Sequence, residues 1–510
     1  MKERVLLVGT VSEVDFPNKA KLMPTGEIPE IPDESPAGIC YVLPEKEYGA
    51  LSIKNVLPEQ KWLVSTRKKG RFSKEAMPVQ LIKKAPYETD APCPHAAWCG
   101  GCSYQTVPYE KQLELKEQQV KKLLKDVPGV SEVLKRGAWD PIRRSPLTEG
   151  YRNKMEFSFG DPCKDGPLTL GLHKKGAFHD IISTGDCRLV HEDLRKILSM
   201  TETYFRDRGF TYYHTYSKEG KLRHLVVRRS FAENRILLNL VTTSRVKDEQ
   251  LLPWVKEILG LELEGEISGI LHTVNDAVAD VVRSDETTCL FGKDYLMESL
   301  LGLQFKIFPF SFFQTNTLGA EALYSMVRDF AGDVSDQLVF DLYCGTGTIA
   351  QIMASAGARE VMGIELVEEA VEAAKENAVL NQLSNCGFLA GDVLKLVDSL
   401  GGKPDLIILD PPRDGIHPKA LPKLLAYGPE RFIYVSCKPT SLVRDLPAFT
   451  QAGYEITRIG CCDMFPFTPH VETVCLLSNT QSKKKESYIT LDVEMADYYR
   501  IKNEGKNSTT

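Results

Sequence analysis

The C-terminal part of the chain alternates short apolar runs with segments of helical periodicity, and this alternation limits the possible fold more than any other feature. The apolar runs after residue 305 lie at 338–342, 361–365, 406–410 and 432–436. Longer segments separate them, and residues 367–380 show helical spacing. Buried strands of a parallel sheet have this pattern because helices cover both of their faces. We therefore predict a doubly wound α/β domain over residues 301–480.

The chain has 510 residues, which is too long for a single hydrophobic core, so further domains are expected. Residues 1–87 carry short apolar runs separated by turn residues, which predicts a small β-rich unit. Residues 88–300 form a mixed α+β central domain, with a helix expected at 107–127 and a hairpin at 222–230 and 235–243. Residues 481–510 are polar and are expected to form a tail.

A basic run lies within the first of these units. One acid, Glu75, interrupts the basic side chains Lys61, Arg67, Lys68, Lys69, Arg71, Lys74, Lys83 and Lys84. A solvated hairpin would explain such a run. A footprint on a phosphate backbone is the functional alternative. A five-stranded barrel of the oligonucleotide-binding type suits both the length and the charge of this unit.

Composition excludes several classes of protein. The formal net charge is −6, so a nucleic-acid partner has to be argued from local patches. No apolar run reaches the length of about 18 residues that a membrane span needs. The first apolar stretch is too short for a secretory signal, so a cytoplasmic location is expected. The 13 cysteines argue against a disulfide framework in that compartment, and their clustering favours metal binding or catalysis.

The apolar run at 338–342 leads into a glycine turn and a helix start, which is the pattern of a nucleotide site. Gly345 and Gly347 let the backbone approach a ligand, and Glu365 closes the next strand, where a carboxylate can bind a ribose diol. The spacing alone would also suit NAD or a turn without a ligand. Asp341 lies at the strand end, where an acid suits a positively charged amino-acid portion and repels a pyrophosphate. This favours S-adenosylmethionine.

Two further strand ends carry the chemistry. Asp410 ends one strand and Cys437 follows another, so both should face the crevice beyond the sheet. A buried free cysteine is the ordinary alternative for Cys437. Beside a methyl donor, a thiolate can add to C6 of a pyrimidine and make C5 nucleophilic, after which a base removes the C5 proton. Lys438 and Arg444 are the candidates for favouring the thiolate.

The base is expected in the stretch before the last apolar run. Glu472 is the favoured candidate, and His470 competes for the role. A carboxylate two residues from a histidine could also serve only as its hydrogen-bond partner. Three cysteines elsewhere, Cys93, Cys99 and Cys102, have the spacing C-x5-C-x2-C, which accepts zinc or an iron–sulfur cluster once a fourth thiolate is found.

The C-terminal half closely resembles the RNA 5-methyluridine (uracil-C5) methyltransferases, a RumA/TrmA-like family that uses S-adenosylmethionine. The matching motifs, in the family's order, are FFQTN (312–316), DLYCGTGT (341–348), LDPPR (409–413), YVSCKP (434–439) and DMFP with Glu472 (463–472). The resemblance implies that Cys437 is the nucleophile and Glu472 the proton acceptor. It implies cofactor contacts from Gln314, Tyr343, Glu365 and Asp410. It also implies that Phe312 is the aromatic side chain beside the target base.

The resemblance extends to the N-terminal half. Cys187 resembles the fourth ligand, and the cluster-bearing branch of the family carries [4Fe–4S] on such a set. Residues 1–87 resemble the TRAM domain, and residues 151–155 are similar to a family motif that supplies a basic patch. Members with both parts act on 23S ribosomal RNA, so the resemblance implies that substrate. We also expect a monomeric enzyme.

Three alternatives remain beside this expectation. The first is a transfer-RNA uridine-C5 methyltransferase. The second is a methyltransferase of another RNA acceptor, such as an amino group, which the Asp410-Pro411-Pro412 element would suit. The third is a non-enzymatic RNA-binding or redox-sensing cluster protein.

Overall fold

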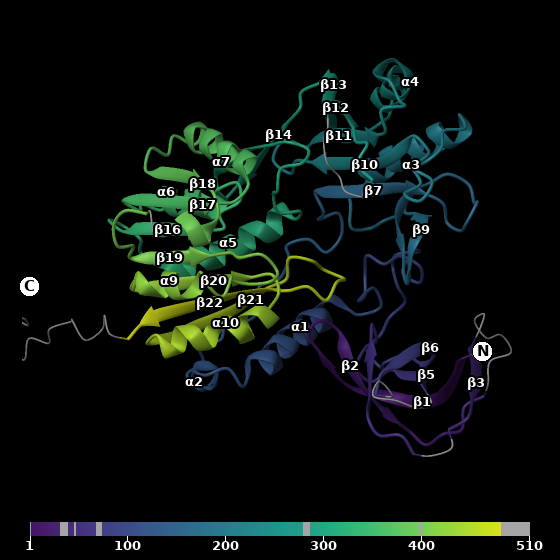
Figure 1. The fold of residues 1–510 in the computed structure, drawn as a ribbon, viewed down its shortest axis with the longest axis horizontal. Helices are drawn as coiled ribbons and strands as arrows, with labels where there is room; N and C mark the ends of the chain where they lie inside the picture. Colours follow the sequence, from purple (N-terminus) through teal and green to yellow (C-terminus); the bar gives the residue numbers. More distant parts are fainter. Residues whose placement is uncertain are drawn as a thin grey trace, which may run out of the picture.

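The structure is a computed structural model that describes residues 2–30, 39–44, 47–67, 74–278, 286–396 and 400–480. It has three parts, each built on its own sheet (Figure 1). The predicted polar tail at 481–510 lies outside the described residues, as do Lys68, Lys69 and Arg71 of the basic run. No helix in the described ranges is long and apolar enough to cross a membrane.

The N-terminal part is a sheet of six strands, whereas the sequence suggested a barrel of five. The strands are β1 (Lys2–Asp15), β2 (Lys19–Pro24), β3 (Ile39–Val42), β4 (Leu51–Lys54), β5 (Lys61–Arg67) and β6 (Ala76–Lys83). They lie in the order β4-β2-β1-β5-β6, and the short β3 pairs with β1. The first and last strands of this order, β4 and β6, approach each other where the Ser52 N–H of β4 donates to the Lys74 carbonyl, just before β6, at 2.6 Å.

The central part is a seven-stranded sheet with the order β13-β12-β11-β10-β7-β8-β9. Its strands are β7 (Lys154–Gly160), β8 (Thr169–Lys174), β9 (Ala177–Ser183), β10 (Leu222–Arg229), β11 (Arg235–Thr242), β12 (Glu266–Val274) and β13 (Glu286–Gly292). Helices α3 (Glu192–Asp207) and α4 (Asp248–Leu259) bury apolar side chains such as Leu198 and Trp254 against it. β10 and β11 are antiparallel neighbours, which confirms the predicted hairpin.

The C-terminal part is the predicted doubly wound α/β domain. Its sheet has the order β18-β17-β16-β19-β20-β22-β21 and is parallel from β18 to β20. The strands are β16 (Leu338–Leu342), β17 (Glu360–Glu365), β18 (Cys386–Ala390), β19 (Leu406–Leu409), β20 (Arg431–Ser436), β21 (Tyr454–Cys462) and β22 (Glu472–Asn479). The helices are α5 (Thr317–Ala331), α6 (Thr348–Ser355), α7 (Glu368–Leu380), α8 (Val393–Leu396), α9 (Leu421–Ala426) and α10 (Thr440–Gln451).

Helices α1 (Tyr109–Leu124) and α2 (Val130–Lys135) belong in space to the C-terminal sheet, although the sequence placed them in the central domain (Figure 1). Val120 and Val133 share an apolar cluster with Phe432 and Ile456. The next segment runs beside β21, where the Asp140 N–H donates to the Ile459 carbonyl at 2.8 Å. A short hairpin, β14 (Leu296–Leu300) and β15 (Leu303–Ile307), joins the central and C-terminal parts.

Candidate active site

The predicted glycine turn lies at the carboxyl end of β16, between β17 and β19. The strand order reverses here, and open α/β sheets bind ligands at such a point. Gly347 has a φ of +73° and begins α6. A Cβ atom at Gly347 would lie 2.5 Å from the Phe388 ring, so both the backbone angle and the packing require glycine.

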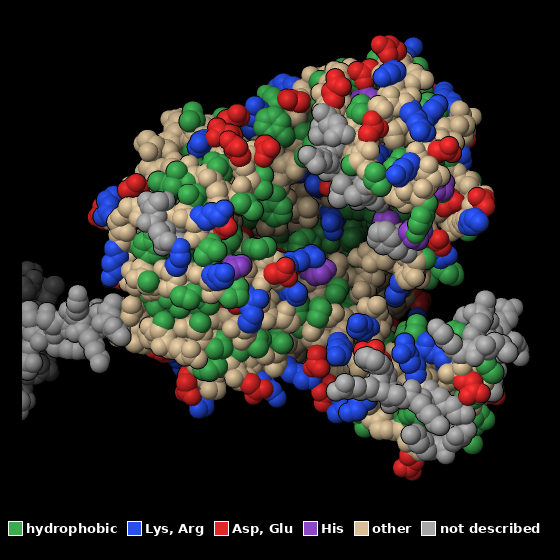
Figure 2. All heavy atoms as spheres, in the orientation of Figure 1, with side chains coloured by type: hydrophobic (Ala, Val, Ile, Leu, Met, Phe, Trp, Pro, Cys, Tyr) green, Lys and Arg blue, Asp and Glu red, His purple; other side chains and the backbone are tan. Residues whose placement is uncertain are grey.

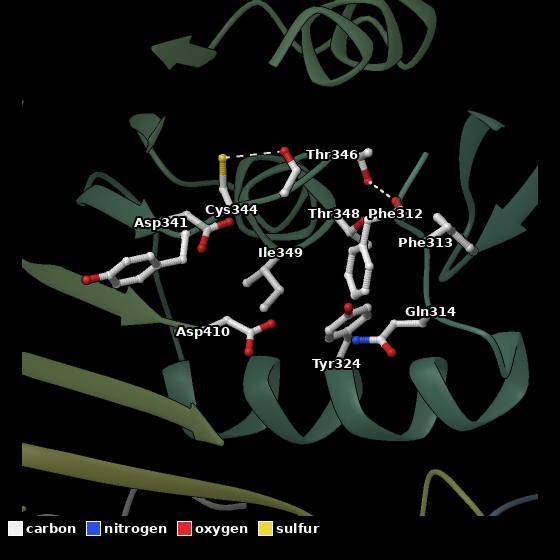
Figure 3. A pocket seen from close by; sticks show the side chains of 12 residues that line it. Phe312, Phe313, Gln314, Tyr324, Asp341, Cys344, Thr346, Thr348, Ile349 and Asp410 are labelled. Carbon is white, nitrogen blue, oxygen red and sulfur yellow. Dashed lines mark hydrogen bonds between the residues drawn. The ribbon is translucent and has the colours of Figure 1, made fainter. Parts of the chain in front are cut away.

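A cavity of about 370 Å³, its open mouth included, lies over this turn (Figure 3). Its lining residues are Phe312, Phe313, Gln314, Tyr324, Asp341, Tyr343, Cys344, Gly345, Thr346, Thr348, Ile349 and Asp410. Three of the four predicted cofactor residues, Gln314, Tyr343 and Asp410, are therefore together. Asp341 and Asp410 come from neighbouring strands on one side, and Gln314 lies beside Tyr324 on the other.

Two buried carboxyl groups give this cavity its electrostatic character. Both oxygens of Asp341 are buried, and within the described ranges no donor makes a well-aligned hydrogen bond to them, although the Ala350 N–H is close enough to lower the pKa of Asp341 in part. Burial, together with Asp410, raises the pKa of Asp341 well above its ordinary value. Burial also raises the pKa of Asp410 to about 7. Buried carboxylates are costly when no cation is paired with them, and a bound cation would relieve that cost.

Glu365 lies at the rim of the same site. Its two carboxylate oxygens accept the N–H of Gly345 at 3.1 Å and the N–H of Val367 at 3.0 Å. These bonds hold the side chain against the glycine turn. A carboxylate has about four lone-pair positions, so it can accept further bonds from a ligand hydroxyl.

Cys437 and Glu472 are brought together by the antiparallel pairing of β20 with β22. Ser436 is paired with Thr473, so the residue after β20 lies beside the first residue of β22. The two side chains interact electrostatically with each other and with Asp410. Burial, with Asp410 nearby, raises the pKa of Glu472 to about 8. A carboxyl group with such a pKa is suited to proton transfer near neutral pH.

The prediction that Lys438 and Arg444 favour the thiolate of Cys437 is wrong. Burial, followed by Glu472 and Asp410, raises the pKa of Cys437 from 9.0 to about 11, so the free site disfavours the thiolate. The cation that lowers this pKa is Arg413, not Lys438 or Arg444. Arg444 instead donates to the buried Asp445 at 2.7 Å, and Asp445 accepts the Ile416 N–H.

The competing base, His470, lies in the loop between β21 and β22, two residues before Glu472. Burial, with Arg413 and Lys116 nearby, lowers its pKa. The imidazole is therefore neutral, and its ring lies edge-on to Phe465, with the ring centroids 6.3 Å apart. Glu472, and not His470, is one of the charged groups that raise the pKa of Cys437.

The loop before Glu472 is held by a buried ion pair that sequence reasoning missed. Lys116 of α1 donates to Asp463 at 2.6 Å and to the Phe465 carbonyl at 3.0 Å, and both charged side chains are fully buried. Gln112 accepts the Phe467 N–H at 2.7 Å. Lys116 lies on the apolar stripe between Leu113 and Val120, where a lysine is unusual, and this was the available signal.

The segment from Pro309 to Thr317 carries Phe312 and Gln314, and the central sheet holds it in place. Asn153 donates from its side chain to the Gln314 carbonyl at 2.9 Å and from its backbone to the Thr315 carbonyl at 2.8 Å. Arg228 of β10 donates to the Pro309 carbonyl at 3.0 Å and also to the Ser311 carbonyl. Phe312 itself is 65% exposed at the mouth of the cavity.

The motif at 151–155 therefore differs from its predicted role as a basic patch. Tyr151 and Asn153 are buried, and the Tyr151 hydroxyl donates to the Pro466 carbonyl at 3.1 Å. Lys154 is paired with Glu156 at 2.6 Å. The motif chiefly joins the central sheet to the two loops of the site.

The four predicted ligand cysteines, Cys93, Cys99, Cys102 and Cys187, line one cavity. Burial, with the neighbouring thiols, raises the pKa of Cys102 to about 12 and that of Cys187 to about 11. Within the described ranges, no three His, Cys, Asp or Glu side chains are grouped closely enough to hold a single metal ion. A cluster spreads its ligands more widely, because each cysteine binds a different iron atom.

The sheet order, the glycine turn and the acidic cavity define the class of protein. They are those of a class I S-adenosylmethionine-dependent methyltransferase. A structure of a tRNA (uracil-54, C5)-methyltransferase from Pyrococcus abyssi, in complex with S-adenosyl-L-homocysteine, has the same fold. Its TM-score is 0.68 at 23% identity, over 92% of this chain and 99% of that one.

Sequence comparisons identify the family. The model of the tRNA (uracil-5-)-methyltransferase family matches residues 265–480. A protein of Clostridium tetani named an uncharacterized RNA methyltransferase is 47% identical over 439 residues, which are 86% of this chain and 93% of the relative. A similarly named protein of Caldanaerobacter subterraneus is 47% identical over 82% of this chain and 90% of the relative. The chain belongs to the S-adenosylmethionine-dependent RNA (uracil-5-)-methyltransferases.

Proposed function

We propose that this enzyme methylates C5 of a uridine in RNA through a covalent bond between Cys437 and C6 of the base. The observation that carries the proposal is the pairing of β20 with β22, which places Cys437 beside Glu472 and both beside Asp410 of the cavity. A thiol next to a carboxyl group with a pKa near 8 is the pair that addition and proton removal require.

In the proposed reaction, the Cys437 thiol releases its proton to solvent, the thiolate adds to C6 of the uracil, and the electron pair moves to C5 and the C4 carbonyl. S-adenosylmethionine supplies the methyl group that C5 then takes. Glu472 accepts the C5 proton, and the electron pair of that C–H bond reforms the double bond as the Cys437 sulfur leaves. Extruding the uridine from folded RNA costs a few kcal/mol, and stacking on Phe312 could return roughly 1–3 kcal/mol.

We assign the cofactor contacts to Gln314, Tyr343, Glu365 and Asp410. The buried oxygens of Asp341, which have no cation beside them in the described ranges, support a positively charged ligand in this cavity, since a sulfonium and an ammonium would each be attracted to them. Glu365, fixed by two backbone N–H groups, is suited to a ribose diol.

The test of the mechanism uses RNA with 5-fluorouridine at the target position, from which no C5 proton can be removed. The wild-type chain should form a stable covalent adduct, and Cys437→Ala should form none. Full methylation activity in Cys437→Ser would instead support transfer to an amino group, because that reaction needs no thiol.

We further propose that Cys93, Cys99, Cys102 and Cys187 hold a [4Fe–4S] cluster. The shared cavity supports this assignment, and the buried thiols would be stabilised as thiolates by bound iron. The purified protein should contain about four iron and four sulfide ions per chain, and Cys187→Ser should lower both.

For the substrate we propose 23S ribosomal RNA, on the resemblance of the four cysteines and the basic N-terminal sheet, taken as a TRAM-like RNA-binding unit, to that branch. Transfer RNA is the second candidate, because the tRNA (uracil-54, C5)-methyltransferase of Pyrococcus abyssi matches 92% of this chain, so the three-part architecture does not itself select ribosomal RNA. Mass mapping of 5-methyluridine in both RNAs from a deletion strain separates the two. The cytoplasmic location and the monomeric state stay predictions.

A further inference from the structure

We propose that the outer edge of the central sheet carries a second contact site for single-stranded RNA, separate from the uridine pocket. The site consists of Trp98, Lys175, His179 and Tyr216, called here the β9-edge surface. This inference rests on the proposed function in one respect, namely that the substrate is RNA. No part of the reaction described above uses these residues.

Two large aromatic side chains are the first reason. Trp98 is 61% exposed and Tyr216 is 85% exposed, whereas Trp139 and Trp254 are buried. Single exposed hydrophobic residues are common, but aromatic side chains gathered with basic ones are a typical surface for nucleic-acid bases. Each exposed ring offers a face on which a base can stack, whatever its identity.

Contacts from three separate segments bring the surface together. The Lys175 N–H donates to the Trp98 carbonyl at 2.6 Å, which fixes the cysteine-rich segment to the turn between β8 and β9. His179 follows on β9, and its ring centroid lies 5.8 Å from that of Tyr216. Trp98 therefore lies at the turn of the β8–β9 hairpin, and Tyr216 lies beside the second strand of the same hairpin.

The charge around these rings is opposite to that of the whole chain. Residues 173–180 and 211–222 together contain four Lys residues and two Asp or Glu residues, while the chain has a net charge of −6. One of the acids, Asp180, is paired with Lys174 at 3.5 Å. A local basic excess beside aromatic rings favours a polyanion with bases, which is RNA, over an acidic or apolar protein.

The position of the surface fits a long RNA that also reaches the uridine pocket. Figure 2 shows histidine and hydrophobic side chains gathered beside the hollow between the central and C-terminal parts, where Figure 1 places β9. The cysteine-rich segment continues from Trp98 to Ser103 and Tyr104, whose N–H groups donate to the Phe467 carbonyl at 2.9 Å. The β9-edge surface is thus linked directly to the loop that leads to Glu472.

The test measures the affinity of the full-length chain, as purified, for fluorescently labelled oligouridylate. Trp98→Ala and Tyr216→Ala should each weaken binding roughly tenfold, as loss of one stacked base does. Lys175→Gln should lower the dependence of log Kd on log salt by about 0.7, the amount expected for one lost phosphate contact on a single strand. Phe291→Ala is the matched control, since Phe291 is an exposed aromatic residue on β13, at the opposite edge of the same sheet.

Photo-crosslinking locates the contact directly. Oligouridylate that contains 4-thiouridine should give adducts on peptides with Trp98 or Tyr216, as well as any at the uridine pocket. Iron content is measured for Trp98→Ala to check that this variant does not disturb the adjacent Cys99. Tyr216→Ala tests stacking on RNA at a position away from the cysteines. Unchanged affinity in both variants and no adducts on these peptides would overturn the inference and leave the surface to a protein partner. Adducts on these peptides in a chain that fails to methylate uridine would support the RNA contact at the β9-edge surface and contradict the proposed reaction.

Discussion

The pKa of Cys437 offers a quantitative test of the site, because the same side chains that serve the reaction also suppress the thiolate. The perturbation is Glu472→Gln, which keeps the size of the side chain and removes its charge. The pKa of Cys437 lies about 2 units above the ordinary 9.0, and burial is the largest cause, followed by Glu472. Glu472 is therefore the charged group that opposes the thiolate most, and the substitution should raise the thiolate fraction about tenfold for each unit by which it lowers the pKa of Cys437.

This effect should depend on pH. Glu472 has a pKa of about 8, so it is ionised above that pH and opposes the thiolate. Below it, the protonated carboxyl group is neutral, as glutamine is. The alkylation rates of wild type and Glu472→Gln should therefore diverge above about pH 8 and converge below about pH 7.

The assay is pulsed alkylation with iodoacetamide, followed by mass spectrometry of the peptide that contains Cys437. Cys163 and Cys289 are exposed and serve as internal standards. Arg413→Gln should slow alkylation of Cys437, since Arg413 lowers its pKa. A rate in Glu472→Gln equal to that of wild type at about pH 9.5, or an apparent pKa of Cys437 below 9, would refute this account of the electrostatics.

Three further results are expected. Lys116→Met should destabilise the chain by about 3–5 kcal/mol in denaturant titrations, because it leaves Asp463 buried and unpaired, and adding Asp463→Asn should recover part of the loss. Asn153→Asp should weaken S-adenosylmethionine binding roughly tenfold by calorimetry, because the carboxylate repels the Gln314 carbonyl, and unchanged binding would contradict the role given to this contact. Gly347→Ala should abolish that binding through the clash with Phe388, whereas Gly401→Ala, which meets open space, should leave it intact.

The sequence predicted the C-terminal sheet well, because its strands are buried on both faces and so appear as continuous apolar runs. The runs at 338–342 and 406–410 became β16 and β19, and the carboxyl groups of Asp341 and Asp410 at their ends face one cavity. Such positions follow from strand ends alone.

Long-range contacts were not predictable in the same way. The prediction that Arg444 favours the Cys437 thiolate was wrong because its side chain, on helix α10, is paired with Asp445. Arg413, which does lower the pKa of Cys437, lies in the loop after another strand, β19. The packing of α1 on the C-terminal sheet was missed because its amphipathic pattern shows which face is buried, but not against what. Asn153 carried no local signal of its contacts with Gln314.

The buried pair between Lys116 and Asp463 means that the methyl-transferring half of this enzyme is not a module that can be excised. A protein beginning at residue 301 would keep the whole α/β sheet and lose helix α1, which belongs to the same apolar cluster as Phe432 and fixes the loop before Glu472. We expect it to aggregate through the uncovered apolar face. Recombination between relatives should accordingly exchange α1 together with the C-terminal sheet.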